Sequence, residues 1–236
     1  DHHLSDDTPK NMSDTTIQTQ IAGQWRDASG PAYTTEYPAD GSIVATLHGA
    51  TAQDVDEAVQ TAERVRQQPA WAGLKRHERA GILYRIASGI RARGEELAQL
   101  PRLDTGKQIN GARALVARAA GTCQFFASAC ETWEDTITPA RGDFVTMSVH
   151  EPLGVVGAIT PWNSPIASEA QKLAPALAAG CAVVFKPAEI TPRMAIELAR
   201  IAEAAGVPPG IISVLPGKGS IVGDALVKHP LIRRIA

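Results

Sequence analysis

The chain has 236 residues, of which 44% are hydrophobic, 20% charged and only 5% aromatic, with a formal net charge of −2. This is globular composition, and the length allows a substantial core in one or two domains. The charge balance leaves no basic surplus to neutralise phosphates, so we expect no nucleic-acid partner. The longest uncharged run, residues 152–168, is interrupted by prolines and is shorter than the about 20 apolar residues of a membrane span. No membrane association is therefore expected.

The first segment, residues 1–16, is polar and shows neither apolar periodicity nor a signal-peptide pattern, which predicts a disordered tail or leader. The three cysteines, Cys123, Cys130 and Cys181, are too few and too scattered for a disulfide framework or a zinc site. We expect all three in the core, no metal site, and a reducing, cytoplasmic location.

The next part of the chain reads as short strands followed by helices. Strand patterns occupy residues 17–25, 32–37 and 43–47, with turn residues between them. Thr51 and Asp54 form a capping-box-like start, and apolar residues at helical spacing follow to residue 65. Further helices are predicted over residues 77–93, 95–100 and 110–133.

A short segment inside this region invites a phosphate-loop interpretation. Asp104-Thr-Gly-Lys107 has the lysine of that motif, but Pro101 stands where its upstream glycine belongs. We therefore reject the phosphate loop.

Residues 134–152 read as an extended hairpin. Its predicted strands are residues 136–138 and 144–149, joined by a glycine turn at Arg141-Gly-Asp143.

From residue 153 on, apolar strands alternate with helices. Strands are predicted over residues 154–160, 181–186 and 211–215, with a further strand beginning at Leu231, and helices over residues 166–177, 192–205 and 220–228. Strands that are apolar nearly throughout are typical of a parallel sheet covered on both faces. The predicted fold class is α/β, with a doubly wound, Rossmann-like parallel sheet.

In such a sheet, ligands bind at the loops beyond the carboxyl ends of the strands. The loop after the third strand contains Gly217, Gly219 and Gly223 in a GxGxxxG pattern, one residue longer than the usual dinucleotide fingerprint. This pattern fits a pyrophosphate bound at the start of a helix. The alternative is that the glycines only allow the chain to turn. Lys186 and Glu189 lie at the end of the second strand. They suit the hydroxyls of an adenosine ribose, or else form an exposed ion pair.

The loop after the first strand holds Asn163 between Pro161 and Pro165. Two prolines stiffen the backbone, and a fixed side-chain amide is a recurrent donor to a developing oxyanion. The alternative is that Asn163 is simply a good turn residue.

Taken together, these loops resemble the aldehyde dehydrogenase superfamily. The segments that carry the resemblance are residues 104–107, 150–156, 159–165, 173–180, 185–192 and 207–217. The resemblance covers residues 17–236 in order and with the family's spacing.

The resemblance implies NAD(P)-dependent oxidation of an aldehyde to a carboxylic acid, with a cysteine thiolate as nucleophile and a glutamate assisting hydrolysis of the thioester. NAD is the expected cofactor and NADP the alternative. Asn163 matches the family's oxyanion asparagine, and Lys186 and Glu189 match the residues that hold the adenine-side ribose. The other implied cofactor-binding residues are Ile159, Thr160, Pro161, Trp162, Ala188, Gly219 and Gly223.

The resemblance also implies a domain organisation. Residues 17–133 and 153–236 would form an incomplete cofactor-binding domain, and residues 134–152 the hairpin through which a full-length protein forms a homodimer or homotetramer. We expect the catalytic domain to be absent from the chain, since none of the chain's three cysteines matches the family's nucleophilic cysteine. Ser164 departs from the bulky aromatic residue that many members carry there, which leaves the size of the aldehyde undefined.

Three hypotheses follow for the function. In the first, the chain is the amino-terminal half of an aldehyde dehydrogenase, inactive alone. In the second, it is a truncated, non-catalytic module that binds a nucleotide or a partner subunit. A third, an ordinary dinucleotide-fold reductase, explains neither Asn163 nor the Lys186–Glu189 loop.

Overall fold

The structure is a computed structural model that describes residues 16–139 and 142–236. Its centre is a parallel sheet of β7 (Val155–Ile159), β8 (Ala182–Lys186), β9 (Ile212–Val214) and β10 (Ile232–Ile235). The strand order is β10-β7-β8-β9, and all three pairings are parallel. β8 and β9 are buried throughout, whereas β10 is mostly exposed at one edge.

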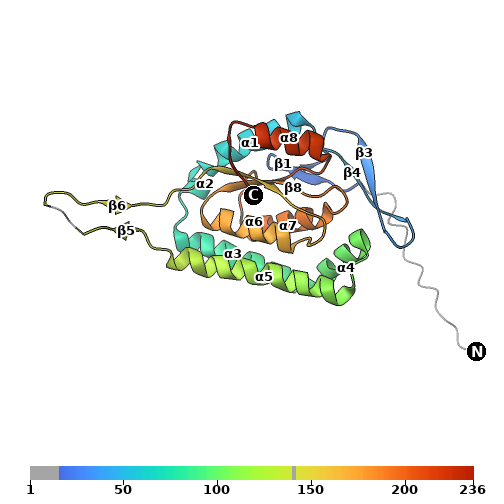
Figure 1. Cartoon of the computed structure of the whole chain (residues 1–236), viewed down its shortest axis with the longest axis horizontal. Helices are drawn as coiled ribbons and strands as arrows, with labels where there is room; N and C mark the ends of the chain where they lie inside the picture. The colour runs from blue at the N-terminus through green and yellow to red at the C-terminus, as the bar shows by residue number, and fades with distance from the viewer. Residues whose placement is uncertain (1–15, 140–141) are drawn as a thin grey trace, which may run out of the picture.

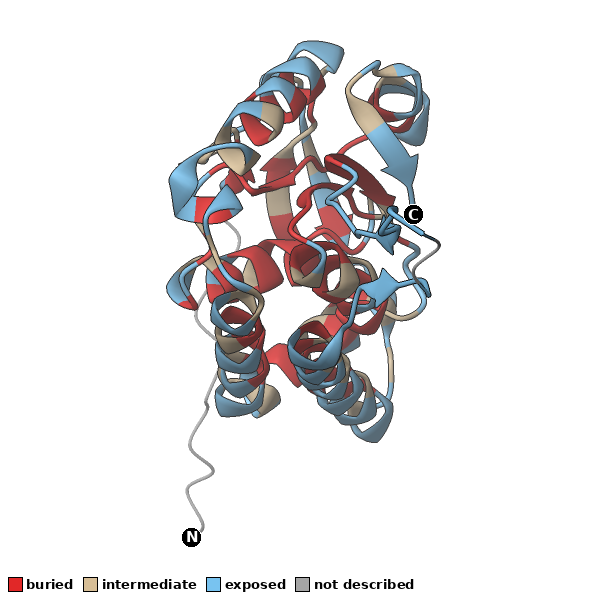
Figure 2. Cartoon of the chain, turned by 90° about the vertical axis from the view of Figure 1, so that its left-hand side faces the viewer, coloured by how far each residue is buried: buried red, intermediate tan, exposed pale blue. Residues whose placement is uncertain are grey.

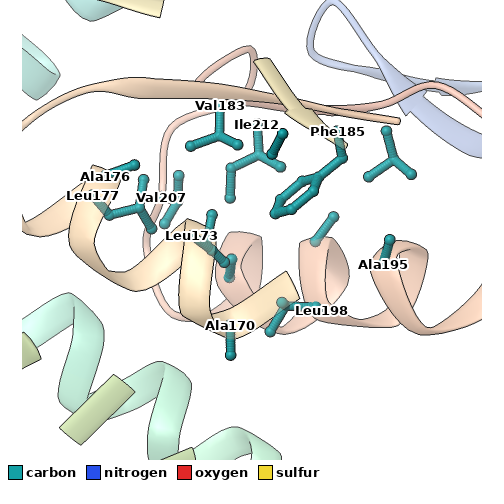
Figure 3. Packing of buried hydrophobic residues seen from close by; sticks show 14 of the residues in the cluster. Ala170, Leu173, Ala176, Leu177, Val183, Phe185, Ala195, Leu198, Val207 and Ile212 are labelled. Carbon is teal, nitrogen blue, oxygen red and sulfur yellow. The ribbon is translucent and has the colours of Figure 1, made fainter. Parts of the chain in front are cut away.

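Helices cover both faces of this sheet (Figure 1). α6 (Ala167–Ala178) and α7 (Arg193–Ala204) lie on one face, and α1 (Ala52–Arg66) and α8 (Asp224–Lys228) on the other. Figure 3 shows Val183, Phe185 and Ile212 of the sheet packed against Leu173 of α6 and Leu198 of α7. The predicted α/β class with a doubly wound parallel sheet is confirmed.

A second helical layer packs beneath α6 and α7. It consists of α3 (Arg76–Ala92), α4 (Gly94–Thr105) and α5 (Ile109–Thr132), with the short α2 (Pro69–Ala72) before it. These helices bury one apolar side each and leave the other side exposed, as Figure 2 shows by colour. Trp71 of α2 is buried, and its indole N–H donates to the carbonyl of Gly180 at 2.9 Å.

Two antiparallel hairpins precede the helices: β1 (Thr19–Ile21) with β2 (Gln24–Arg26), and β3 (Ala32–Glu36) with β4 (Ile43–His48). Thr19 is tied to the central sheet, because its hydroxyl donates to the carbonyl of Val214 at 2.5 Å. The predicted tail over residues 1–16 lies outside the described residues except for Thr16, which makes a β-bridge to Thr46.

The predicted hairpin arm projects from the rest of the molecule (Figure 1). Its strands, β5 (Thr136–Ile137) and β6 (Met147–Ser148), are antiparallel but shorter than predicted. Ala140 and Arg141 lie outside the described residues, so the predicted turn is described only from Gly142 on. No helix in the described ranges is long and apolar enough to cross a membrane.

Other elements also differ from the sequence prediction. The strand pattern predicted over residues 17–25 forms two strands, β1 and β2, because the chain turns back at Ala22 and Gly23, which both have a positive φ. α2 was not predicted, because four residues are too few to show a helical period. α4 was expected to end at residue 100, before Pro101, but continues to Thr105 and ends at Gly106, whose φ is 68°. The helix expected over residues 220–228 begins instead as a π-helical turn, η1 (Gly219–Gly223), and becomes α-helical at Asp224.

The last turn of α4 persists because a buried ion pair anchors it. The Nε of Arg193, the first residue of α7, donates to Oδ1 of Asp104 at 2.8 Å, and both side chains are almost fully buried. Burial raises the pKa of Asp104 to about 6 against the attraction of Arg193, so the carboxyl is ionised at neutral pH. The pair therefore links the last turn of α4 to the start of α7, the helix that follows the loop after β8.

We predict that Arg193→Ala lowers the free energy of unfolding by about 3–5 kcal/mol, because it leaves the Asp104 carboxylate buried without its partner. Urea denaturation measures this loss. The matched control is Arg113→Ala, which removes the exposed ion pair with Glu95 and should leave the free energy of unfolding nearly unchanged. Equal losses in the two variants would contradict the prediction.

Candidate functional site

The parallel register of the sheet brings three loops to one edge. Ile159, the last residue of β7, pairs with Lys186, the last residue of β8, and Phe185 pairs with Val214 at the end of β9. The strand order also reverses at β7, because β8 and β9 lie on one side of it and β10 on the other. Ligands of doubly wound sheets bind at such a reversal, beyond the carboxyl ends of the strands.

The loop after β7 carries the predicted oxyanion donor. Thr160 is buried, and its N–H donates to the carbonyl of Lys186 at 3.1 Å. Pro161, Trp162 and Asn163 are exposed, with Trp162 at 55%. The structure therefore joins Ile159 and Thr160 to Lys186 and presents Asn163 on the surface of the loop. We find no hydrogen bond from the Asn163 side chain to another residue in the described part of the chain.

A residue that the sequence interpretation missed lies directly behind this loop. Glu169, in the first turn of α6, is fully buried, and its Oε1 accepts a hydrogen bond from the Thr160 hydroxyl at 2.8 Å. Desolvation raises the pKa of Glu169 to about 7, although the bond from Thr160 and the backbone N–H of Ile166 favour its charged form. The available signal was a carboxylate on the apolar face of a helix, which is unusual unless it has a partner.

The loop after β8 holds the predicted ribose-binding residues. Lys186 is buried, and burial lowers the pKa of its ammonium group against the attraction of Glu189. Ala188 is half-buried, and its carbonyl accepts from the N–H of Thr191 at 3.1 Å, which closes the loop before α7. Glu189 is half-buried and points away from this turn toward the next loop.

That next loop, after β9, meets Glu189 directly. The N–H of Gly219 donates to Oε1 of Glu189 at 3.0 Å. Gly217 has a φ of 140°, and a Cβ there would lie 3.1 Å from the backbone nitrogen of Ala50, so only glycine allows the close approach. Gly219 is exposed and Gly223 buried, and a Cβ at either would meet nothing within 4 Å. The helix start beyond Glu189 is therefore open.

A cavity of about 330 Å³ lies beside this contact. It is lined by Glu189 together with Pro31, Ala32, Tyr33, Gly49, Ala50, Gly217, Lys218 and Ile221. Burial and the nearby charge of Glu189 raise the pKa of Tyr33. The lining from residues 31–50 was missed from the sequence, because only tertiary packing brings the β3–β4 hairpin to this edge. Of the predicted site residues, only Glu189 lines this cavity. Residues 159–163, Lys186, Ala188, Gly219 and Gly223 lie outside its lining.

The cysteines take no part in the site. All three are buried, as predicted, and burial raises the pKa of the Cys123 thiol to about 12 and also raises that of Cys130. A thiol with a raised pKa is a poor nucleophile, because the thiolate is the reactive form. No group of three or more His, Cys, Asp or Glu side chains that could hold a metal ion occurs within residues 16–139 and 142–236.

Comparison with known proteins gives the family. The sequence profile of the aldehyde dehydrogenase family matches residues 25–236. An aldehyde dehydrogenase from Bacillus cereus, solved as an NAD+ complex, is similar at 34% identity and a TM-score of 0.91, over 94% of this chain and 45% of that one. The aldehyde dehydrogenase KauB from Pseudomonas aeruginosa matches at 34% identity and a TM-score of 0.90, over 93% and 45%. A betaine aldehyde dehydrogenase from Staphylococcus aureus, in complex with NAD+, matches at 31% identity and a TM-score of 0.90, over 93% and 45%.

The chain therefore belongs to the aldehyde dehydrogenase family, and it spans about 45% of the length of these structures.

The raised pKa of Glu169 predicts a pH dependence of stability. The folded state holds the Glu169 proton up to a pH of about 7, whereas the unfolded state releases it near the ordinary glutamate pKa of 4.5. Between these values the folded state binds more protons, so this residue makes stability fall as pH rises, by at most about 1.4 kcal/mol per pH unit.

The measurement is urea denaturation of the wild type and of Glu169→Gln at several pH values between 4.5 and 8. The difference between the two should change with pH up to about 7 and become constant above it. A difference that is constant over the whole range would show that folding does not raise the pKa of Glu169.

Proposed function

We propose that this chain forms the cofactor-binding part of an enzyme that oxidises an aldehyde to a carboxylic acid with NAD. The observation that carries the proposal is the contact between Glu189 and the N–H of Gly219, which joins the loops after β8 and β9 at the carboxyl edge of the sheet. The NAD+ complexes of the Bacillus cereus and Staphylococcus aureus relatives support the choice of cofactor.

The residues at this edge fit a dinucleotide. Glu189 uses Oε1 for Gly219, and among the described residues no donor occupies its Oε2, which leaves an acceptor for a ribose hydroxyl. Lys186 adds a donor from the preceding strand, and Ala188 lies in the turn between them. Gly219 and Gly223 leave space for a pyrophosphate to approach the backbone. Ile159, Thr160, Pro161 and Trp162 would line the site on the side of β7.

NAD, when bound, supplies the hydride acceptor for the oxidation. Asn163 would donate its side-chain N–H to the oxyanion that forms when a nucleophile attacks the aldehyde carbonyl, which lowers the energy of that intermediate. The thiolate and the general base would come from residues outside this sequence, since all three cysteines here are buried. The same three free thiols suit a reducing, cytoplasmic location.

A non-catalytic nucleotide-binding or subunit-interaction module is the second candidate, because the chain matches only about 45% of each catalytic relative. The deciding experiment uses the protein as the cell makes it. NAD binding is followed by fluorescence titration, and aldehyde-dependent NADH formation by absorbance. Binding with turnover supports the enzyme, binding without turnover supports the module, and absence of both contradicts the proposal.

We predict that Asn163→Ala lowers kcat by about 100- to 1,000-fold, the usual effect of losing one oxyanion donor. NAD affinity should change little, since the amide acts on the reacting carbonyl. Steady-state kinetics with a short aliphatic aldehyde test this, with Asn110→Ala, an exposed asparagine at the start of α5, as the matched control. A kcat equal to that of the control would remove the assigned role.

Glu189 should make the protein prefer NAD, because its carboxylate repels the 2′-phosphate of NADP. Replacing it by the neutral amide in Glu189→Gln should shift the ratio of kcat/KM values toward NADP by roughly 10-fold or more. The control is Glu131→Gln, an exposed glutamate on α5. A wild-type preference for NADP would contradict this role of Glu189.

The hairpin arm supports a proposal about assembly. Residues 134–152 expose several large apolar side chains, including Ile137 at 71%, Phe144 at 77% and Met147 at 60%. Such exposure on a projecting arm marks a protein contact. We propose that the arm packs against a second copy, so that the complete protein is a homodimer or homotetramer.

Analytical ultracentrifugation checks the assembly. Phe144→Asp should shift the protein toward the monomer, because it places a charge in the buried contact. The control is Ile43→Asp, an exposed apolar residue on β4. A wild-type protein that sediments as a monomer would contradict the proposal.

A further inference from the structure

We propose that Glu169 is a positioning residue that holds the loop over residues 160–166, and with it Asn163, in the geometry needed for oxidation. This inference rests on the function proposed above, in which Asn163 acts on the oxyanion. Glu169 itself is buried behind the loop and acts through it.

The first support is the way Glu169 closes the loop. Its Oε1 accepts from the Thr160 hydroxyl at 2.8 Å, and the Thr160 N–H in turn donates to the carbonyl of Lys186 on β8. Thr160 is thus fixed to the sheet on one side and to α6 on the other. The loop that carries Asn163 leaves and returns at this contact, so its two ends cannot move independently.

The second support is backbone strain at the return of the loop. Ile166 has a φ of 64° and a ψ of −45°, and its side chain is fully buried. A positive φ in a β-branched residue is costly, about 1–3 kcal/mol, and persists only where the surroundings impose it. Ile166 lies three residues before Glu169, so the strained residue and the carboxyl that holds Thr160 stand together at the start of α6.

The third support is what lies between these anchors. Pro161 and Pro165 restrict the backbone on either side of Trp162, Asn163 and Ser164. An anchor at the two ends therefore determines where the Asn163 amide lies. A displacement of about 1 Å at a catalytic group can cost 100-fold in rate, so a residue that touches no substrate can still affect turnover.

Packing alone does not account for a carboxyl at this position. The Oε2 of Glu169 is buried and, among the described residues, has no hydrogen-bond partner. An unpaired buried oxygen costs stability, so an apolar side chain would fill the space at lower cost. The contact that an apolar residue would not make is the one with Thr160.

The test is a double-mutant cycle in the complete enzyme. Glu169→Ala should lower kcat roughly 10- to 100-fold when Asn163 is present, and only about 2-fold or less in the Asn163→Ala background, since a positioning residue has no effect once its target is gone. Glu169→Gln keeps an oxygen acceptor for Thr160 and should restore kcat to within about 3-fold of wild type. Equal decreases in the two backgrounds, or no decrease, would overturn the proposal.

A second measurement does not depend on activity. Hydrogen exchange at the amides of residues 162–164 and 166 should be faster in Glu169→Ala than in wild type. Glu78→Ala is the control, because Glu78 is also a glutamate in the first turn of a helix, α3, and accepts the Lys75 N–H at 2.7 Å. Its side chain is exposed, and it lies far along the chain from the loop. Unchanged exchange in Glu169→Ala overturns the positioning role, whether or not the protein oxidises an aldehyde. If exchange is faster in Glu169→Ala but the wild-type protein oxidises no aldehyde, the positioning role stands and the proposed function is rejected.

Discussion

The burial of the central sheet on both faces is the constraint on which the rest of this structure depends. β7, β8 and β9 have no exposed face, so their backbone groups must pair with one another, and parallel pairing holds them in register. Register in turn places the ends of the three strands side by side. The loops that follow are polar and separated by whole helices in sequence, yet they share one edge because the strands before them cannot slip.

Short polar contacts then decide how these loops lie relative to one another. Glu189 reaches the backbone of the next loop at Gly219, and Thr160 is held between the carbonyl of Lys186 and the carboxyl of Glu169. These contacts join consecutive βα units at their carboxyl ends. The ion pair of Asp104 with Arg193 secures the other end of the β8 loop, where α7 begins. The candidate site is thus built from connections between loops more than from any single motif.

The fold was accessible from the sequence because its signals are local. Apolar runs of strand length, alternating with helical periods and ended by glycines such as Gly180 and Gly206, specify a doubly wound sheet without reference to distant contacts. The departures occurred where a distant contact overrides the local rule. Pro101 should end α4, but the buried pair at Asp104 supports one more turn beyond it. The first turn of the last helix widened to a π-turn over Gly219–Gly223, a sequence with little helical preference of its own.

The sequence by itself determined the class of the fold and the loops in which candidate residues such as Asn163, Lys186 and Glu189 stand, since these follow from periodicity and from residues close together along the chain. It also carried the resemblance to the aldehyde dehydrogenase family, through loop segments that match the motifs of that family. Only the tertiary structure decided which of these residues meet. It placed Glu189 against Gly219, brought the β3–β4 hairpin to the cavity, and set a buried Glu169 behind the Asn163 loop. The physical reason is that burial and hydrogen bonding between distant segments depend on the packing of whole elements, and no local pattern of residues encodes that packing.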